Sequence, residues 1–174
     1  MTTGKELDGA QERSDFLQAL STHRSFLRQT VEGLTDEQAR ERTTVSELCL
    51  GGLIKHVTSA ERRWTDFIVR GSVALGGFDE SSIEAHIAGF CVQEEETLAI
   101  LLERYEEVAR ATEELVASVP SLEDSHDLPA APWFAPGARW TARQTLLHII
   151  AETAQHAGHA DIIRESLDGA KTMG

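Results

Sequence analysis

Apolar residues recur at steps of three and four along most of the chain, the spacing that places them on one face of an α-helix. This pattern predicts a first helix over residues 12–32, which Gly33 ends. Thr35 and Gln38 form a capping box, so we expect a short helix over residues 36–42.

Two further long helices are expected in the middle of the chain. The first covers residues 46–71, and the second covers residues 83–119 and stops before Pro120. Gly51 and Gly52 lie inside the first of these helices. Glycine lowers helix propensity, but it lets a neighbouring backbone approach closely.

A long loop and a last helix complete the chain. The loop, residues 121–140, is rich in proline, and a loop of this length in a compact domain is more often functional than idle. Thr141 and Gln144 form a second capping box, which opens a helix that we expect to end near Leu167.

The whole pattern favours an all-α fold. No segment shows a convincing strand alternation or an internal repeat, and a chain of 174 residues can bury a substantial core. We therefore expect a four-helix bundle in a single domain over residues 1–174, with residues 1–11 flexible.

Charge and composition narrow the range of partners. The formal net charge of -13 argues against binding to nucleic acid or to an anionic membrane surface. No apolar run is long enough to span a bilayer, and the N-terminal segment lacks the apolar core of a signal peptide. Cys49 and Cys91 are too few for a disulfide framework, which fits a reducing cytoplasm, and we expect both to be buried apolar residues.

Polar side chains form one stripe on the last helix. His148, Glu152, His156 and His159 follow one another at steps of four, four and three residues, so they share one face. Burial of imidazoles beside a carboxylate is costly without a partner, and a divalent metal is a natural partner for them. An exposed polar face is the alternative, but alanines and isoleucines flank the stripe and count against it.

A further ligand is expected from the second long helix, where His56 lies among apolar residues. Ligand sites in bundles are built from inward-facing residues on facing helices. Glu152 and His156 could chelate a metal together with His56, or His148 could bind with Glu152 instead. Histidines that are not ligands could contact substrate or orient the carboxylate.

Three segments of the chain resemble the DinB/YfiT-like family of metal-dependent four-helix bundles. They are GLTDEQARER, GGLIKHVTSAERRW and RWTARQTLLHIIAETAQHAGHADIIRE, and the resemblance covers nearly the whole chain. In this family one histidine of the second helix and two ligands a turn apart on the last helix hold the metal. The resemblance thus implies His56, Glu152 and His156 as metal ligands, with His148 and His159 in supporting roles.

The residue at position 152 points to one branch of that family. Most members have histidine there, whereas this chain has Glu152 and so resembles the branch whose ligand set is His-Glu-His. That branch includes mycothiol-dependent maleylpyruvate isomerase and mycothiol S-transferases of actinobacteria. The isomerase has an additional C-terminal domain that contributes to its active site, and this chain ends at Gly174. The resemblance therefore implies a transferase that conjugates a low-molecular-weight thiol, mycothiol in particular, to small electrophilic molecules.

The donor set allows more than one chemistry. Two imidazoles and one carboxylate suit zinc, although nickel or iron could replace it. A thiol bound there would lose its proton and become a nucleophile, whereas a bound water would make a hydrolase. A non-enzymatic metal-binding module is a third reading, but structural zinc sites normally have four protein ligands.

Other side chains are candidates for the surroundings of the site. Trp133, Phe134 and Trp140 could wall a pocket, or could pack over the end of the bundle. Glu61 could orient a ligand, and a solvated ion pair is the alternative for it. We expect either a monomer or a homodimer.

Overall fold

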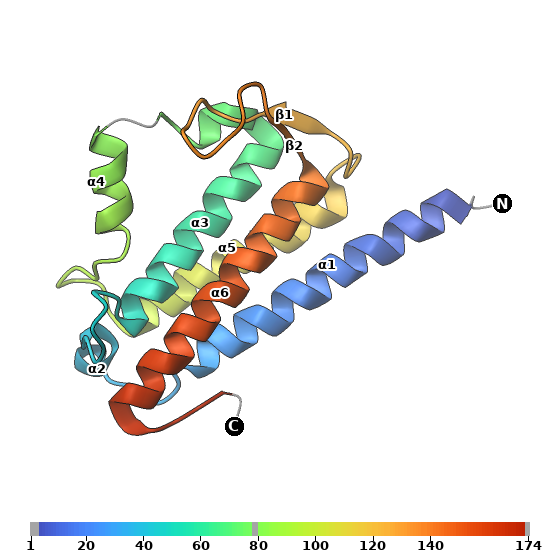
Figure 1. Ribbon diagram of the computed structural model, residues 1–174. Coiled ribbons are helices and arrows are strands. Elements are labelled where there is room, and N and C mark those ends of the chain that lie inside the picture. The colour runs from blue at the N-terminus through green and yellow to red at the C-terminus, as the bar shows by residue number, and fades with distance from the viewer. Residues whose placement is uncertain (1–3, 78–79, 173–174) are drawn as a thin grey trace.

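The computed structural model describes residues 4–77 and 80–172 (Figure 1). The fold is an all-α bundle, as expected. Its four long helices are α1 (Gly4–Gln29), α3 (Leu50–Arg70), α5 (Leu98–Ser118) and α6 (Ala142–Asp168). In the described part of the chain, no helix combines the length and the apolar character needed to cross a membrane.

The two capping boxes set the starts of two helices as predicted. The Thr35 hydroxyl accepts a hydrogen bond from the backbone N–H of Gln38 at 3.2 Å, at the start of α2 (Asp36–Arg40). The Thr141 hydroxyl accepts a hydrogen bond from the backbone N–H of Gln144 at 3.1 Å, at the start of α6. Each box satisfies backbone donors that the first turn of a helix leaves unpaired.

The first two long helices begin at other residues than predicted. Helix α1 begins at Gly4 rather than near residue 12, and α3 begins at Leu50 rather than at Ser46. Residues 1–3 lie outside the described part of the chain, and flexibility over residues 1–11 stays a prediction. A 3₁₀ turn, η1 (Gly71–Ala74), follows α3.

The single helix predicted over residues 83–119 is wrong. The chain forms α4 (Glu80–Ala88) and then α5, with a non-helical connection between them. Thr97 favours this break because its hydroxyl caps α5, accepting from the Ile100 amide at 3.3 Å. The Arg40 guanidinium also donates to three carbonyls of the connection, those of Gln93, Glu94 and Glu96.

The break also corrects the expectation for one cysteine. Cys49 is buried as expected, but Cys91 is exposed. Cys91 lies in the connection between α4 and α5 instead of on the inward face of a long helix.

The loop before α6 contains a small sheet that the sequence pattern did not predict. Strands β1 (Ser125–Asp127) and β2 (Arg139–Thr141) pair antiparallel, with His126 opposite Trp140. The sheet ties the ends of residues 128–138 together at the upper end of the bundle in Figure 1. The strands are too short for their alternation to be visible in the sequence.

A buried polar layer separates two apolar clusters in the interior. Arg24 of α1 and Glu61 of α3 form an ion pair, and the Thr112 hydroxyl of α5 also donates to Glu61. Glu61 is 1% exposed, so the solvated ion pair proposed for it is wrong. The central members of one cluster are Leu27, Val31, Leu53, Val57, Leu101, Tyr105, Ala157 and Ile163, and those of the other are Phe16, Leu20, Ile68, Val116, Leu122, Leu146 and Ile149.

Gly52 permits a close backbone contact, as the sequence suggested. A Cβ atom at this position would lie 2.1 Å from the carbonyl oxygen of Phe90. Because glycine has no Cβ, the connection after α4 can pass directly over α3. This contact brings Phe90 to the face of α3 that carries His56.

Candidate metal centre

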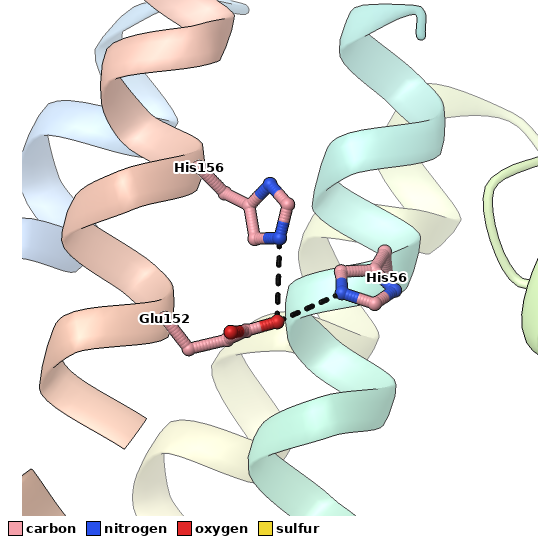
Figure 2. A group of neighbouring side chains, drawn as sticks. All are labelled: His56, Glu152 and His156. Carbon is pink, nitrogen blue, oxygen red and sulfur yellow. Dashed lines mark hydrogen bonds and ion pairs between the residues drawn. The ribbon is translucent and has the colours of Figure 1, made fainter. Parts of the chain in front are cut away.

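The candidate ligands come from two helices that pack against each other. His56 lies on α3, and Glu152 and His156 lie one turn apart on α6 (Figure 2). The Glu152 Oε1 atom is 3.0 Å from His56 Nε2 and 3.3 Å from His156 Nε2. One nitrogen or oxygen atom from each of the three residues lies within 4.8 Å of the others.

The two imidazoles hold the glutamate in its charged form. Hydrogen bonds from His156 and then from His56 keep the pKa of the Glu152 carboxyl well below its usual range, although partial burial opposes them. A carboxylate only accepts hydrogen bonds, so each imidazole presents an N–H to it in the absence of a metal. The site therefore combines one negative charge with two nitrogen donors.

Aromatic packing fixes the first histidine. His56 is 4% exposed, and Phe90 stacks on its ring with the centroids 3.9 Å apart and the planes 14° apart. The His156 ring meets His56 edge to face at 4.8 Å. The buried position of His56 therefore depends on the connection that Gly52 allows to approach.

These three residues fit a divalent metal. Two imidazole nitrogens and one carboxylate oxygen are a usual three-ligand set for catalytic zinc, which keeps a further position for water or substrate. Among the described residues the group has these three members, and His56 and Glu152 also line a cavity, so the group opens to one side. The arrangement could hold a metal ion and leave room for an exogenous ligand.

The other two histidines of the stripe have different surroundings. His159 Nδ1 lies 3.4 Å from His156 Nδ1, so His159 contacts one of the candidate ligands from behind. His148 lies in the cavity wall, with its ring 4.6 Å from Trp64 and 5.1 Å from Trp140. Desolvation lowers the pKa of His148, which favours its neutral form.

The cavity beside the three residues has a volume of about 210 Å³. Its walls come from α3, α4, α6, the residue after η1 and the loop between the two strands. The described residues that line this cavity do not include Cys49, Cys91 or Glu61. The lining residues are His56, Ala60, Arg63, Trp64, Leu75, His86, Trp133, Phe134, His148 and Glu152.

Three residues of these surroundings were not identified from the sequence. Phe90 stacks on His56, His86 meets the same ring edge to face at 5.4 Å, and Arg63 lines the cavity. Desolvation, and then the neighbouring His56, lowers the pKa of His86. Arg63 lies seven residues after His56, a helical spacing that could have placed both on one face. No comparable signal exists for His86 and Phe90, since their positions depend on the break after α4.

The aromatic residues of the long loop divide between two roles. Trp133 and Phe134 line the cavity, in agreement with the expectation of a pocket wall. Trp140 instead stacks on Trp64, with ring centroids 5.1 Å apart, and supports the wall from outside. The loop therefore contributes both to the cavity and to packing at the end of the bundle.

Comparisons with known proteins agree with this architecture. The model of the mycothiol-S-transferase family matches residues 15–169. No curated protein matches the sequence. A crystal structure of a conserved protein from Enterococcus faecalis superposes with a TM-score of 0.63 and 15% identity, over 90% of this chain and 97% of that chain, which shows a shared fold.

The family match extends from α1 to the residue after α6, and so includes α3, α6 and the three candidate ligands. It confirms the resemblance that the sequence motifs indicated. The chain belongs to the mycothiol-S-transferase family.

Proposed function

We propose that this protein is a metal-dependent transferase that joins mycothiol to small electrophilic molecules. The observation that carries the proposal is the His56–Glu152–His156 group, which opens onto a cavity in a chain of this family. In the proposal these three side chains hold a divalent metal, with zinc as the preferred ion.

A bound divalent metal would favour the thiolate over the thiol and so supply the nucleophile. The protein's own residues then have three tasks. Trp64, Trp133 and Phe134 exclude water and contact the apolar part of the electrophile. His148 is held in its neutral form within the cavity, so it can accept the proton that the thiol gives up. The sulfur–carbon bond forms as the bond to the leaving group breaks, or as an epoxide or activated alkene opens.

His159 acts through a candidate ligand in this proposal. Its ring touches the His156 ring, so it can orient that imidazole toward the metal. Residues that hold a ligand in this way typically contribute tenfold to a hundredfold, as an order of magnitude, to metal affinity. We therefore assign His159 as a positioning residue and His148 as a residue of the cavity.

Metal analysis tests the ligand set. Purified protein is expected to contain roughly one divalent metal per chain, and His56→Ala is expected to lose it because two donors hold a metal poorly. His159→Asn should retain a metal of lower affinity, by about tenfold or more. His23→Ala, which changes a histidine of α1, is the matched control and should leave the metal content unchanged. Unchanged metal content in His56→Ala would show that the ligand assignment is wrong.

A conjugation assay tests the reaction. The metal-loaded protein is incubated with a chlorinated bimane and with mycothiol, glutathione or no thiol, and the fluorescent adduct is measured. We expect an adduct with mycothiol that disappears in His56→Ala. Ester hydrolysis without a thiol, in the absence of any adduct, would contradict the transferase and favour a hydrolase.

A further inference from the structure

Arg63 is the unusual charged residue of the cavity. It lines the cavity, and its Nε atom is buried without a hydrogen-bond partner among the residues that the structure describes. A buried donor without a partner is rare in folded proteins, because its hydration is lost and not replaced. The Arg63 side chain as a whole is only partly buried and lines the cavity, so the rest of its guanidinium can meet an acceptor that enters the cavity.

The position of Arg63 relates it to the candidate metal centre. His56, Ala60 and Arg63 are spaced by four and three residues on α3, so they lie along one face of the helix. At 1.5 Å per residue, Arg63 lies about 10 Å along the helix axis from His56. Both residues line the same cavity, about two helical turns apart on α3.

No carboxylate among the described residues that line the cavity neutralises Arg63. Glu152 is the one carboxylate among the described residues that line the cavity, and it accepts a hydrogen bond from His56 and pairs with His156. The guanidinium is thus a fixed positive charge within a protein whose formal net charge is -13. Such a group offers a planar fork of donors that matches a carboxylate.

We propose that Arg63 binds an anionic group, a carboxylate or its equivalent, on one of the two co-substrates and thereby selects acidic molecules for this cavity. The identity of these molecules as an electrophile and a thiol rests on the proposed function. The binding step itself involves no metal and no covalent change. Arg63 is a specificity-determining residue, since it fixes one end of a molecule whose other end reaches His56 and Glu152.

Binding of unreactive probes tests this proposal. One pair, 4-methylbenzoate and 4-methylbenzamide, represents an electrophile with and without the charge. A second pair, N-acetyl-S-methylcysteine and its amide, represents the thiol partner, and the amide is the member that matches mycothiol, whose cysteine carboxyl is amide-linked. Affinities are measured by calorimetry and by quenching of tryptophan fluorescence, because Trp64 and Trp133 line the cavity. We expect the carboxylate of one pair to bind about tenfold more tightly than its amide, as for a charge-assisted hydrogen bond.

Variants of α3 assign that preference to one side chain. Arg63→Met should remove the preference, and Arg63→Lys should keep a smaller one, because lysine retains the charge but not the planar fork. Arg62→Met is the matched control, since Arg62 is the exposed neighbour on the same helix. Circular dichroism and the Tm of each variant verify that it is folded.

Metal coordination of the carboxylate is the competing explanation, and chelation separates the two. If Arg63 binds the anion, the preference persists after treatment with EDTA. A preference that disappears with EDTA but survives in Arg63→Met overturns the proposal. Equal binding of acid and amide by the wild-type protein, or no binding of any probe, overturns it as well.

The outcome is independent of transferase activity. A preference that depends on Arg63 in a protein that forms no thiol adduct would contradict the proposed function and retain this inference. Adduct formation by a protein that shows no carboxylate preference would support the proposed function and contradict this inference. A preference within the first pair assigns the charge to the electrophile, whereas a preference within the second pair alone would exclude mycothiol as the thiol.

Discussion

At the scale of single residues, two buried or half-buried glutamates in adjacent parts of the bundle have different partners. Glu61 is enclosed by Arg24 and Thr112 and has no access to the cavity. Glu152 is held by His56 and His156 and remains partly exposed at the cavity wall. A carboxylate that a permanent cation neutralises is suited to stabilising the fold, whereas one that only imidazoles hold is suited to binding a metal.

Removal of the cation from the enclosed pair should destabilise the protein strongly. Arg24→Met leaves the Glu61 charge buried and unpaired, so we expect the free energy of unfolding to fall by about 3–5 kcal/mol. Arg28→Met is the matched control one turn later, because Arg28 pairs with Glu106 at the surface at 2.7 Å. An exposed pair of this kind typically contributes no more than about 1 kcal/mol. Urea titration measures both values, and equal losses in the two variants would contradict the enclosed role of Glu61.

At the scale of elements, the segment between α3 and α5 shapes the site. Helix α4 stands apart from the four long helices in Figure 1, and the connection after it returns to the lower part of α3. Through this path His86 and Phe90 reach the His56 ring, which α3 alone would leave uncovered. The four long helices provide the ligands, and this segment determines how deeply His56 is buried.

Gly52 is the position on which that path depends most directly. In Gly52→Ala the new Cβ would meet the Phe90 carbonyl at 2.1 Å, so the connection must move away. We expect a loss of stability of about 1–3 kcal/mol, as for other overpacked sites, together with weaker metal binding.

Gly158→Ala provides the matched control within α6. A Cβ there meets no heavy atom within 4 Å, and the residue lies beside the candidate ligands in sequence. Because alanine favours a helix more than glycine does, we expect a gain of about 0.5–1 kcal/mol. Tm and metal affinity are measured for both variants. A stable Gly52→Ala variant with normal metal affinity would show that the connection is not needed at its present position.

At the scale of the whole molecule, the candidate metal centre links parts of the chain that are far apart in sequence. His56 and Glu152 are separated by 96 positions, and α3 and α6 pack side by side and contribute to both apolar clusters. A ligand that binds only the folded state stabilises it by mass action. A metal held by both helices should therefore contribute to the stability of the entire bundle.

Metal removal tests this contribution. At a free metal concentration about a hundredfold above Kd, binding adds about 2.7 kcal/mol to the free energy of unfolding. For a domain of this size that corresponds to a decrease of roughly 5–10 °C in Tm after treatment with EDTA. His56→Ala should show no response to EDTA, since it lacks the site. An equal response in the variant would place the stabilising metal elsewhere.

The sequence by itself determined the local features of this protein. Apolar periodicity and the capping boxes at Thr35 and Thr141 placed α2 and the start of α6, because these signals act within one or two turns. The spacing of Glu152 and His156 predicted that they share a helix face, and the motifs indicated the family that the comparison confirmed.

The tertiary structure alone decided which faces meet. The break between α4 and α5, the stacking of Phe90 on His56 and the burial of Glu61 against Arg24 all depend on how each helix is rotated against its neighbours. Periodicity shows that a helix has an inward face, but it contains no information about the partner of that face. Arg63 illustrates the difference: its place on α3 is readable from the sequence, whereas the burial of its Nε atom without a partner among the described residues depends on the surrounding structure.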